Sequence, residues 1–179
     1  MEQDNSALVV LVPEAEPLVA EFRDQFDPSA KTGLGAHITV LFPFRPSDHV
    51  SRADLALLKT LFAAAARFTF TLAGIERFPS VALYLSPAPL DPFKELTRSV
   101  AASFPDCPPY RGLFLNPVPH LTIAQQPPAE DLDSVGAQFR LKAQGFLPLA
   151  CTATEVCLVF KRDGRWSVAE RFLLDDDRG

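Results

Sequence analysis

Two short stretches of the sequence each place a histidine and a threonine two residues apart. AHITVLFPF contains His37 and Thr39, and PHLTIA contains His120 and Thr122. Two imidazoles can serve as base and acid at the same near-neutral pH. Two fixed hydroxyl donors can stabilise the charge that develops on phosphoryl oxygens, without any metal. The four side chains therefore suit the opening of a cyclic phosphodiester, with one acid or base and one donor on each side of the phosphorus.

Other interpretations of these residues remain open. A histidine in a strand is often a hydrogen-bonded structural residue, and threonine is common in strands because of its β propensity. A metal site that uses His37, His120 and a carboxylate is a further alternative, although the sequence has neither an H-E-x-x-H motif nor an aspartate cluster. The repetition of the motif in a chain with only three histidines favours catalysis. We therefore expect no metal and no cofactor.

Both motifs lie in apolar runs typical of strands, and side chains on a strand alternate between its two faces. This alternation predicts that each histidine shares a face with its threonine, while the neighbouring apolar residues point to the core: Ile38, Val40 and Phe42 in the first run, and Leu121 and Ile123 in the second. If the two strands lie next to each other, all four polar side chains line one cleft.

The remaining elements must form the scaffold that positions these strands. Apolar runs and alternating patterns predict further strands, and helical spacing predicts the helices between them. We expect strands at 7–12, 36–42, 67–73, 81–85, 118–124 and 146–153, a hairpin at 155–173, and helices at about 14–26, 51–66, 91–104 and 130–141. Mixed strands and helices with hairpins indicate an α+β fold with largely antiparallel pairing. The 83-residue separation of the motifs, nearly half the chain, suggests two related lobes.

Composition narrows the class of protein further. The net charge of −5 argues against binding of long nucleic acid, which needs a basic face. No apolar run approaches the ~18 residues that a membrane span needs, and the acidic start of the chain is unlike a signal peptide. We therefore expect a cytoplasmic protein. Cys107, Cys151 and Cys157 have no zinc-site spacing and are expected to be small buried residues or free thiols, although a catalytic cysteine stays open.

The paired H-x-T motifs and their flanking residues resemble those of the 2H phosphoesterase superfamily. More narrowly, the chain is similar to the 2′-5′ RNA ligase-like branch, which includes RNA 2′,3′-cyclic phosphodiesterases. The resemblance covers nearly the whole chain through the segments ALVVLVP, GAHITVLFPF, VALYLSP, FPDCPPYRGLF and PHLTIAQ. It implies a single bilobal domain over residues 1–179. In this fold two pseudo-symmetric lobes of mainly antiparallel sheet carry helices on the outside and enclose an active cleft.

The same resemblance implies roles for the motif residues. His37 and His120 would be the acid/base pair, Thr39 and Thr122 would hold the phosphate, and no metal would be needed. Family substrates carry 2′,3′-cyclic phosphates or 2′-5′ linkages, on RNA ends or on small nucleotides. Both motifs are intact in this chain. The resemblance leaves open which histidine is the acid and in which direction the net reaction runs.

Three residues near the motifs are candidates for the cleft walls. Phe44 and Tyr110 could stack on a base, and Arg111 could meet a phosphate. The alternative for each is ordinary packing or a solvated loop. We expect the partner to be a nucleotide or a short RNA rather than long duplex nucleic acid or a membrane, and we expect a monomer.

Three hypotheses about function follow. The first is a metal-independent phosphodiesterase. The second is a protein that holds a nucleotide or RNA end in the same cleft without turnover. The third is a structural or interaction protein, in which loss of His37 or His120 would change stability but not ligand behaviour.

Overall fold

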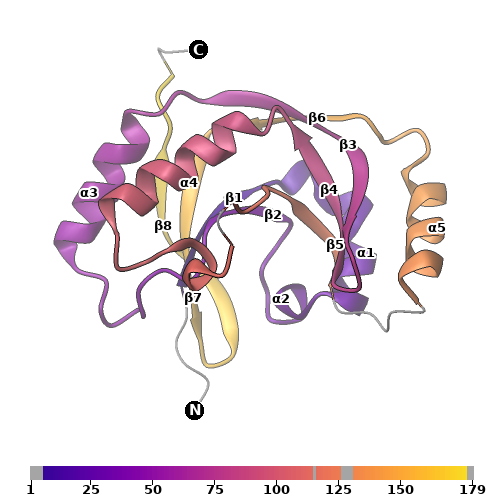
Figure 1. Ribbon diagram of the computed structural model, residues 1–179, viewed down its shortest axis with the longest axis horizontal. Helices are drawn as coiled ribbons and strands as arrows, with labels where there is room; N and C mark the ends of the chain where they lie inside the picture. The colour runs from indigo at the N-terminus through magenta and orange to yellow at the C-terminus, as the bar shows by residue number, and fades with distance from the viewer. Residues whose placement is uncertain (1–5, 115, 126–130, 177–179) are drawn as a thin grey trace.

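One continuous eight-stranded sheet forms the centre of the molecule (Figure 1). The computed structural model describes residues 6–114, 116–125 and 131–176. The spatial order of the strands is β6-β3-β4-β5-β2-β1-β7-β8. Their bounds are β1 (Ser6–Leu11), β2 (His37–Leu41), β3 (Phe68–Phe78), β4 (Ala82–Ala88), β5 (Leu121–Gln125), β6 (Leu149–Ala153), β7 (Glu155–Arg162) and β8 (Arg165–Leu173).

Every neighbouring pair of these strands is antiparallel. The α+β class with antiparallel pairing is therefore confirmed. The two lobes expected from the resemblance share one curled sheet, because β2 pairs with β5 at its centre. None of the helices in the described ranges is long and apolar enough to cross a membrane.

The longer helices lie along the outside of the curled sheet (Figure 1). Their bounds are α1 (Glu16–Phe26), α2 (Pro28–Lys31), α3 (Arg52–Ala63), α4 (Asp91–Ser103) and α5 (Asp131–Ala143), with short 3-10 turns η1 (Pro13–Ala15) and η2 (Pro109–Gly112). Helix α1 follows β1 but packs against β5, and α4 follows β4 but packs against β2. The Thr97 hydroxyl of α4 also donates to the Val40 carbonyl at 2.8 Å. Each half of the sheet therefore supplies a helix that covers the central strand of the other half.

A β-bulge interrupts the alternation in both motif strands. Leu8 pairs with Leu41, but the next residue, Val9, pairs with Thr39. The same shift occurs in β5, where Leu83 pairs with Ala124 and Tyr84 with Thr122. An extra residue in one strand moves the following side chain to the other face. Phe42 therefore returns to the face that carries His37, which corrects the expectation that it shares a face with Ile38.

Two hydrophobic clusters lie on opposite faces of the sheet. The main core lies between the sheet and the helices and contains Leu8, Val10, Ile38 and Leu121. A second cluster, here called the small core, lies on the face that carries the motif histidines. It consists of buried Ala7, Val9, Leu34, Cys157 and Val159, with Leu11, Phe42 and Trp166 packed against them.

Candidate active site

The central strand pair brings the four motif side chains together. Ile38 is the register partner of Leu121, and the two strands run in opposite directions. His37 therefore lies next to Thr122, and Thr39 lies next to His120, all on one face of the sheet. This is the arrangement that the sequence predicts for a shared cleft.

Each histidine ring is oriented by a carbonyl two residues earlier in the chain. The Nδ1 atom of His37 lies 2.8 Å from the Gly35 oxygen, and the Nδ1 atom of His120 lies 2.7 Å from the Val118 oxygen. A carbonyl oxygen can only accept a hydrogen bond, so Nδ1 carries the proton in both rings. In the neutral form, the Nε2 atom of each ring is then the one that can accept a proton.

The surroundings favour the neutral form of both rings. Burial, the nearby Arg23 guanidinium and His120 together lower the pKa of His37 to about 4, against the raising effects of the Gly35 hydrogen bond and Asp27. Burial also lowers the pKa of His120, against the raising effects of the Val118 hydrogen bond and of Asp27. Both rings are half-buried. At neutral pH the unliganded site therefore holds two uncharged imidazoles.

A buried ion pair beneath the histidines was missed from the sequence. Arg23 and Asp27 are 2% and 1% exposed, and the Arg23 Nε atom lies 3.0 Å from Asp27 Oδ2. Asp27 also accepts hydrogen bonds from the backbone and hydroxyl of Ser29, and Arg23 donates to the Leu34 carbonyl at 3.0 Å. The spacing of four residues on a helix signals an ion pair, but it does not signal burial.

Tyr110 is the predicted wall residue that lies beside both motifs. Its backbone nitrogen donates to the Phe42 carbonyl at 2.6 Å, and its side chain hydrogen-bonds with Thr39. Burial raises the pKa of Tyr110. Its ring also lines a cavity of about 450 Å³ that His120 and Thr122 border. The 3-10 turn η2 therefore joins the two halves of the site.

This cavity beside His120 has aromatic walls. The rings of Phe78 and Tyr84 stack with centroids 4.4 Å apart, and the Phe78 ring meets His120 edge-on at 5.0 Å. Phe114 forms another wall and packs edge-on against Tyr110 at 5.5 Å. Nothing in the sequence marked Phe78 and Phe114 as wall residues, because they are distant in sequence and only the fold brings them to the same cavity. Tyr84 is buried behind Phe78 and does not line the cavity.

The other two predicted wall residues lie elsewhere. Phe44 is only 5% exposed and packs edge-on against Phe104 with centroids 5.1 Å apart. It belongs to the main core and has no free face for a base, which corrects the stacking role suggested for it. Arg111 is exposed in the turn η2 and is not among the residues that line the cavity.

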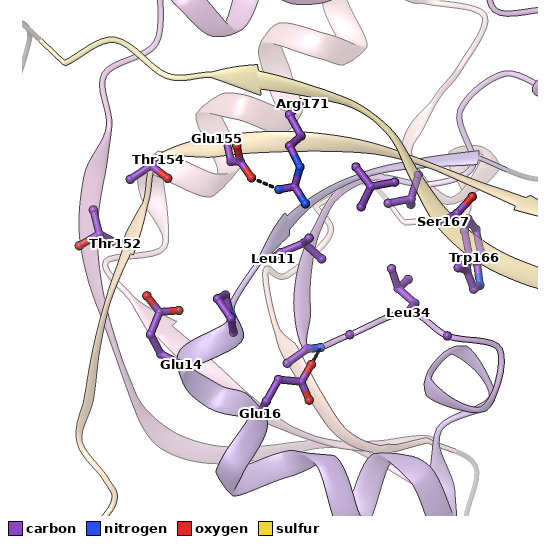
Figure 2. A pocket seen from close by; sticks show the side chains of 16 residues that line it. Leu11, Glu14, Glu16, Leu34, Thr152, Thr154, Glu155, Trp166, Ser167 and Arg171 are labelled. Carbon is purple, nitrogen blue, oxygen red and sulfur yellow. Dashed lines mark hydrogen bonds and ion pairs between the residues drawn. The ribbon is translucent and has the colours of Figure 1, made fainter.

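A second cavity, of about 420 Å³, lies on the far side of the small core and is shown in Figure 2. Its lining includes Glu14, Glu16, Glu155 and Trp166, but none of the four motif side chains. Glu155 forms an ion pair with Arg171, and Glu16 accepts a 2.5 Å hydrogen bond from the Ala36 nitrogen. Glu16 therefore fixes the start of β2 immediately before His37.

Within the described residues, no group of three or more His, Cys, Asp or Glu side chains is placed to hold a metal ion. Cys107, Cys151 and Cys157 are all buried as free thiols. Burial raises the pKa of Cys151 and of Cys157 to about 11, so neither is a reactive thiolate near neutral pH.

Comparison with known proteins identifies the family of this chain. The sequence model of the 2′-5′ RNA ligase superfamily matches residues 11–165, which include both motifs. The chain belongs to the 2′-5′ RNA ligase superfamily. These proteins are 2H phosphoesterases, which supports a phosphoesterase activity in general terms for this member. No curated protein matches the chain.

Solved structures of the superfamily show the same fold. Escherichia coli LigT complexed with 3′-AMP superposes with a TM-score of 0.62 at 18% identity, covering 97% of this chain and 99% of that one. The protein TT0787 of Thermus thermophilus also gives 0.62 at 18% identity, covering 97% of this chain and all of that one (100%). LigT has also been solved with NADP+, with a TM-score of 0.60 at 19% identity and coverage of 98% and 100%. At these identities the likeness concerns the fold.

Proposed function

We propose that this superfamily member is a metal-independent phosphodiesterase. It acts on 2′,3′-cyclic phosphate ends of RNA or of small nucleotides, or on 2′-5′ linkages, by two-histidine acid/base catalysis. The observation that carries the proposal is the pairing of β2 with β5. It aligns two imidazoles and two threonine hydroxyls on one face, with both Nε2 atoms left free by the Nδ1 hydrogen bonds.

Each side chain then has a chemical task. One imidazole takes the proton of the attacking water, and the other gives a proton to the departing oxygen. Thr39 and Thr122 donate hydrogen bonds to the non-bridging oxygens, where negative charge increases in the transition state. Tyr110 contacts the nucleoside, and the exposed Arg111 meets a further phosphate of a longer substrate. The solved LigT complex with 3′-AMP supports a nucleotide as the ligand class.

The alternative is a protein that binds a nucleotide or an RNA end in the same cleft without turnover. The two uncharged imidazoles are compatible with it, since neutral rings can also hydrogen-bond a bound phosphate. Turnover separates the two functions, because a binding protein returns its ligand chemically unchanged.

The test is an assay with EDTA on adenosine 2′,3′-cyclic phosphate and on a short RNA with a 2′,3′-cyclic end. We expect a single monophosphate product from wild type and a loss of at least about 10²-fold in His37→Ala and in His120→Ala. His49→Ala is the matched control, because His49 is an exposed loop residue whose side chain is 71% accessible.

Binding of these compounds without any product would contradict catalysis and support the binding protein. Activity that EDTA abolishes and that zinc or manganese restores would contradict the metal-free mechanism. Full activity in both histidine variants would show that any turnover arises elsewhere.

A further inference from the structure

The cavity of about 420 Å³ in Figure 2 lies among the turn η1, the end of β6 and the strand β8. It shares no lining residue with the cavity beside His120, and none of the four motif side chains borders it. Its volume falls in the range typical of small-molecule sites. We call it the acidic cavity, after the carboxylates of Glu14, Glu16 and Glu155 on its walls.

The charges that line the acidic cavity do not cancel. Its ionisable side chains are three carboxylates and the single guanidinium of Arg171, which leaves a net charge of −2 at neutral pH. Arg171 forms its ion pair with Glu155. Glu14 is exposed and forms no ion pair with any residue that the structure describes. The cavity therefore repels phosphates and attracts cations.

Glu16 is fixed in position, but its charge is not neutralised. Its Oε1 atom accepts a 2.5 Å hydrogen bond from the Ala36 nitrogen, which orients the carboxylate. The nearby Arg23 guanidinium borders a small adjoining hollow with Glu16, but its Nε atom lies 3.0 Å from Asp27 in the buried ion pair. Glu16 therefore presents a fixed negative charge to the cavity.

Other walls of the acidic cavity suit the apolar part of a ligand. Figure 2 shows Trp166 on the side of the cavity away from Glu14. The face of an indole ring attracts a cation more strongly than the other aromatic rings do. Leu11, Leu34 and Val168 extend this apolar surface. A ligand that combines positive charge with an apolar body therefore fits the lining.

The carboxylates are too dispersed to hold one metal ion. A calcium or magnesium ion needs several oxygen ligands around a single point, and no group of three or more His, Cys, Asp or Glu side chains in the described part of the chain is placed in this way. An elongated molecule with two ammonium groups can reach separate carboxylates. The hydroxyls of Thr152, Thr154 and Ser167 can accept its remaining N–H hydrogen bonds.

We propose that the acidic cavity is a binding site for a small aliphatic diamine. One ammonium group binds Glu14, and the second binds Glu16 next to the Trp166 ring, while the methylene chain packs on the apolar wall. The diamine supplies the two positive charges that the lining lacks. The inference is independent of the proposed function, because it uses none of the four motif side chains.

The binding test uses 1,5-diaminopentane as the probe and the fluorescence of Trp166 as the signal. Trp166 is the only tryptophan of the chain, so its emission reports on this cavity. We expect a saturable change with a Kd of about 1 mM or below. The control compound is 1,5-pentanediol, which has the same length but no charge, and KCl keeps the ionic strength equal in all samples.

Isothermal titration calorimetry on the same mixtures detects binding that leaves the emission unchanged. Saturable heat with the diamine and none with the diol would support the inference. Equal binding of the two compounds, or no saturable signal by either method with diamine at about twenty times the expected Kd, would overturn it.

Two variants and a matched control locate the probe. Glu14→Gln removes one charge, and we expect Kd to rise about threefold or more. In Glu14→Gln combined with Glu16→Gln we expect about tenfold or more, and the amide oxygen at position 16 can still accept the Ala36 hydrogen bond. Glu170→Gln is the control, because Glu170 is an exposed residue of β8 that does not line the cavity.

The control should bind the diamine with the wild-type Kd. An unchanged Kd in the double variant, with wild-type circular dichroism, would show that the diamine binds elsewhere. An equal loss in Glu170→Gln and Glu14→Gln would show a diffuse attraction to an acidic chain. Either result would overturn the inference, and neither would affect the phosphodiesterase proposal.

Discussion

At the scale of single residues, the two histidines are oriented alike but surrounded differently. Both rings donate Nδ1–H to a carbonyl two residues earlier in the chain, so neither Nδ1 atom donates to a carboxylate that would raise the basicity of its ring. Arg23 lowers the pKa of His37, while Asp27 opposes the lowering for both rings. The pKa of His37 is therefore lowered more than the pKa of His120.

The pH dependence of kcat/KM follows from these pKa values. The proposed mechanism needs one neutral and one protonated ring, so activity is expected to fall as pH drops through the His37 pKa of about 4. It is also expected to fall as pH rises through the His120 pKa, which lies below its ordinary 6.5, because neither ring then stays protonated. We expect a bell-shaped profile with its maximum on the acidic side of neutrality. A maximum of kcat/KM above about pH 7.5 would contradict the lowered pKa values of the two rings.

A substrate with a leaving group that needs no proton separates the acid from the base. On bis(4-nitrophenyl) phosphate, whose nitrophenolate departs unprotonated, we expect His120→Ala to lose much less activity than the roughly 10²–10⁴-fold expected on the cyclic phosphate. In His37→Ala, activity should fall by a similar factor on both substrates, because the attacking water still requires a base. Release of nitrophenolate can be followed by absorbance, and the reverse pattern would exchange the two roles.

At the scale of elements, the segment from α1 to β2 connects the buried ion pair to the site. Arg23 binds the Leu34 carbonyl, and the next residue, Gly35, supplies the carbonyl that orients His37. Glu16 binds the Ala36 nitrogen at the same strand end. A displacement of this segment therefore changes both the small core and the orientation of the His37 ring.

Asp27→Asn tests this connection through stability. The amide keeps the shape of the side chain but leaves the 2%-exposed Arg23 guanidinium without an opposite charge. We expect a loss of about 3–5 kcal/mol in the free energy of unfolding, measured by urea denaturation. Asp24→Asn, a change at an exposed neighbour on α1, should alter it by less than about 0.5 kcal/mol. A loss below about 1 kcal/mol in Asp27→Asn would show that Arg23 keeps solvent or another partner.

At the scale of the whole molecule, the sequence predicts the features of the fold that depend on local residue patterns. The alternation in the motif strands, the helical spacing and the hairpin at 155–173 are local patterns. They predicted the α+β class, and the alternation predicted the shared face of each histidine and its threonine. The pairing of β2 with β5 joins residues 83 positions apart in the sequence, so it was inferred only from the repetition of the motif.

What sequence could not supply depends on long-range packing. The bulge that turns Phe42 toward the small core arises from register against β1, and the burial of Phe44 arises from its contact with Phe104 on a distant loop. From the sequence alone, Phe42 and Phe44 cannot be distinguished from phenylalanines that are exposed in the wall of a cleft. The cavity beside His120 likewise exists only where β3, β4 and the segment before β5 meet.

The carbonyl anchors of the two rings have a consequence for mutational robustness. The acceptors are main-chain atoms of Gly35 and Val118, so the tautomer of each ring depends on the path of the backbone rather than on the identity of a neighbouring side chain. At Gly35 this path leaves little room, because an added Cβ would lie 2.8 Å from the Glu16 Oε1 atom that holds the next residue. Side chains that do not hold these two segments can therefore change without reorienting the imidazoles.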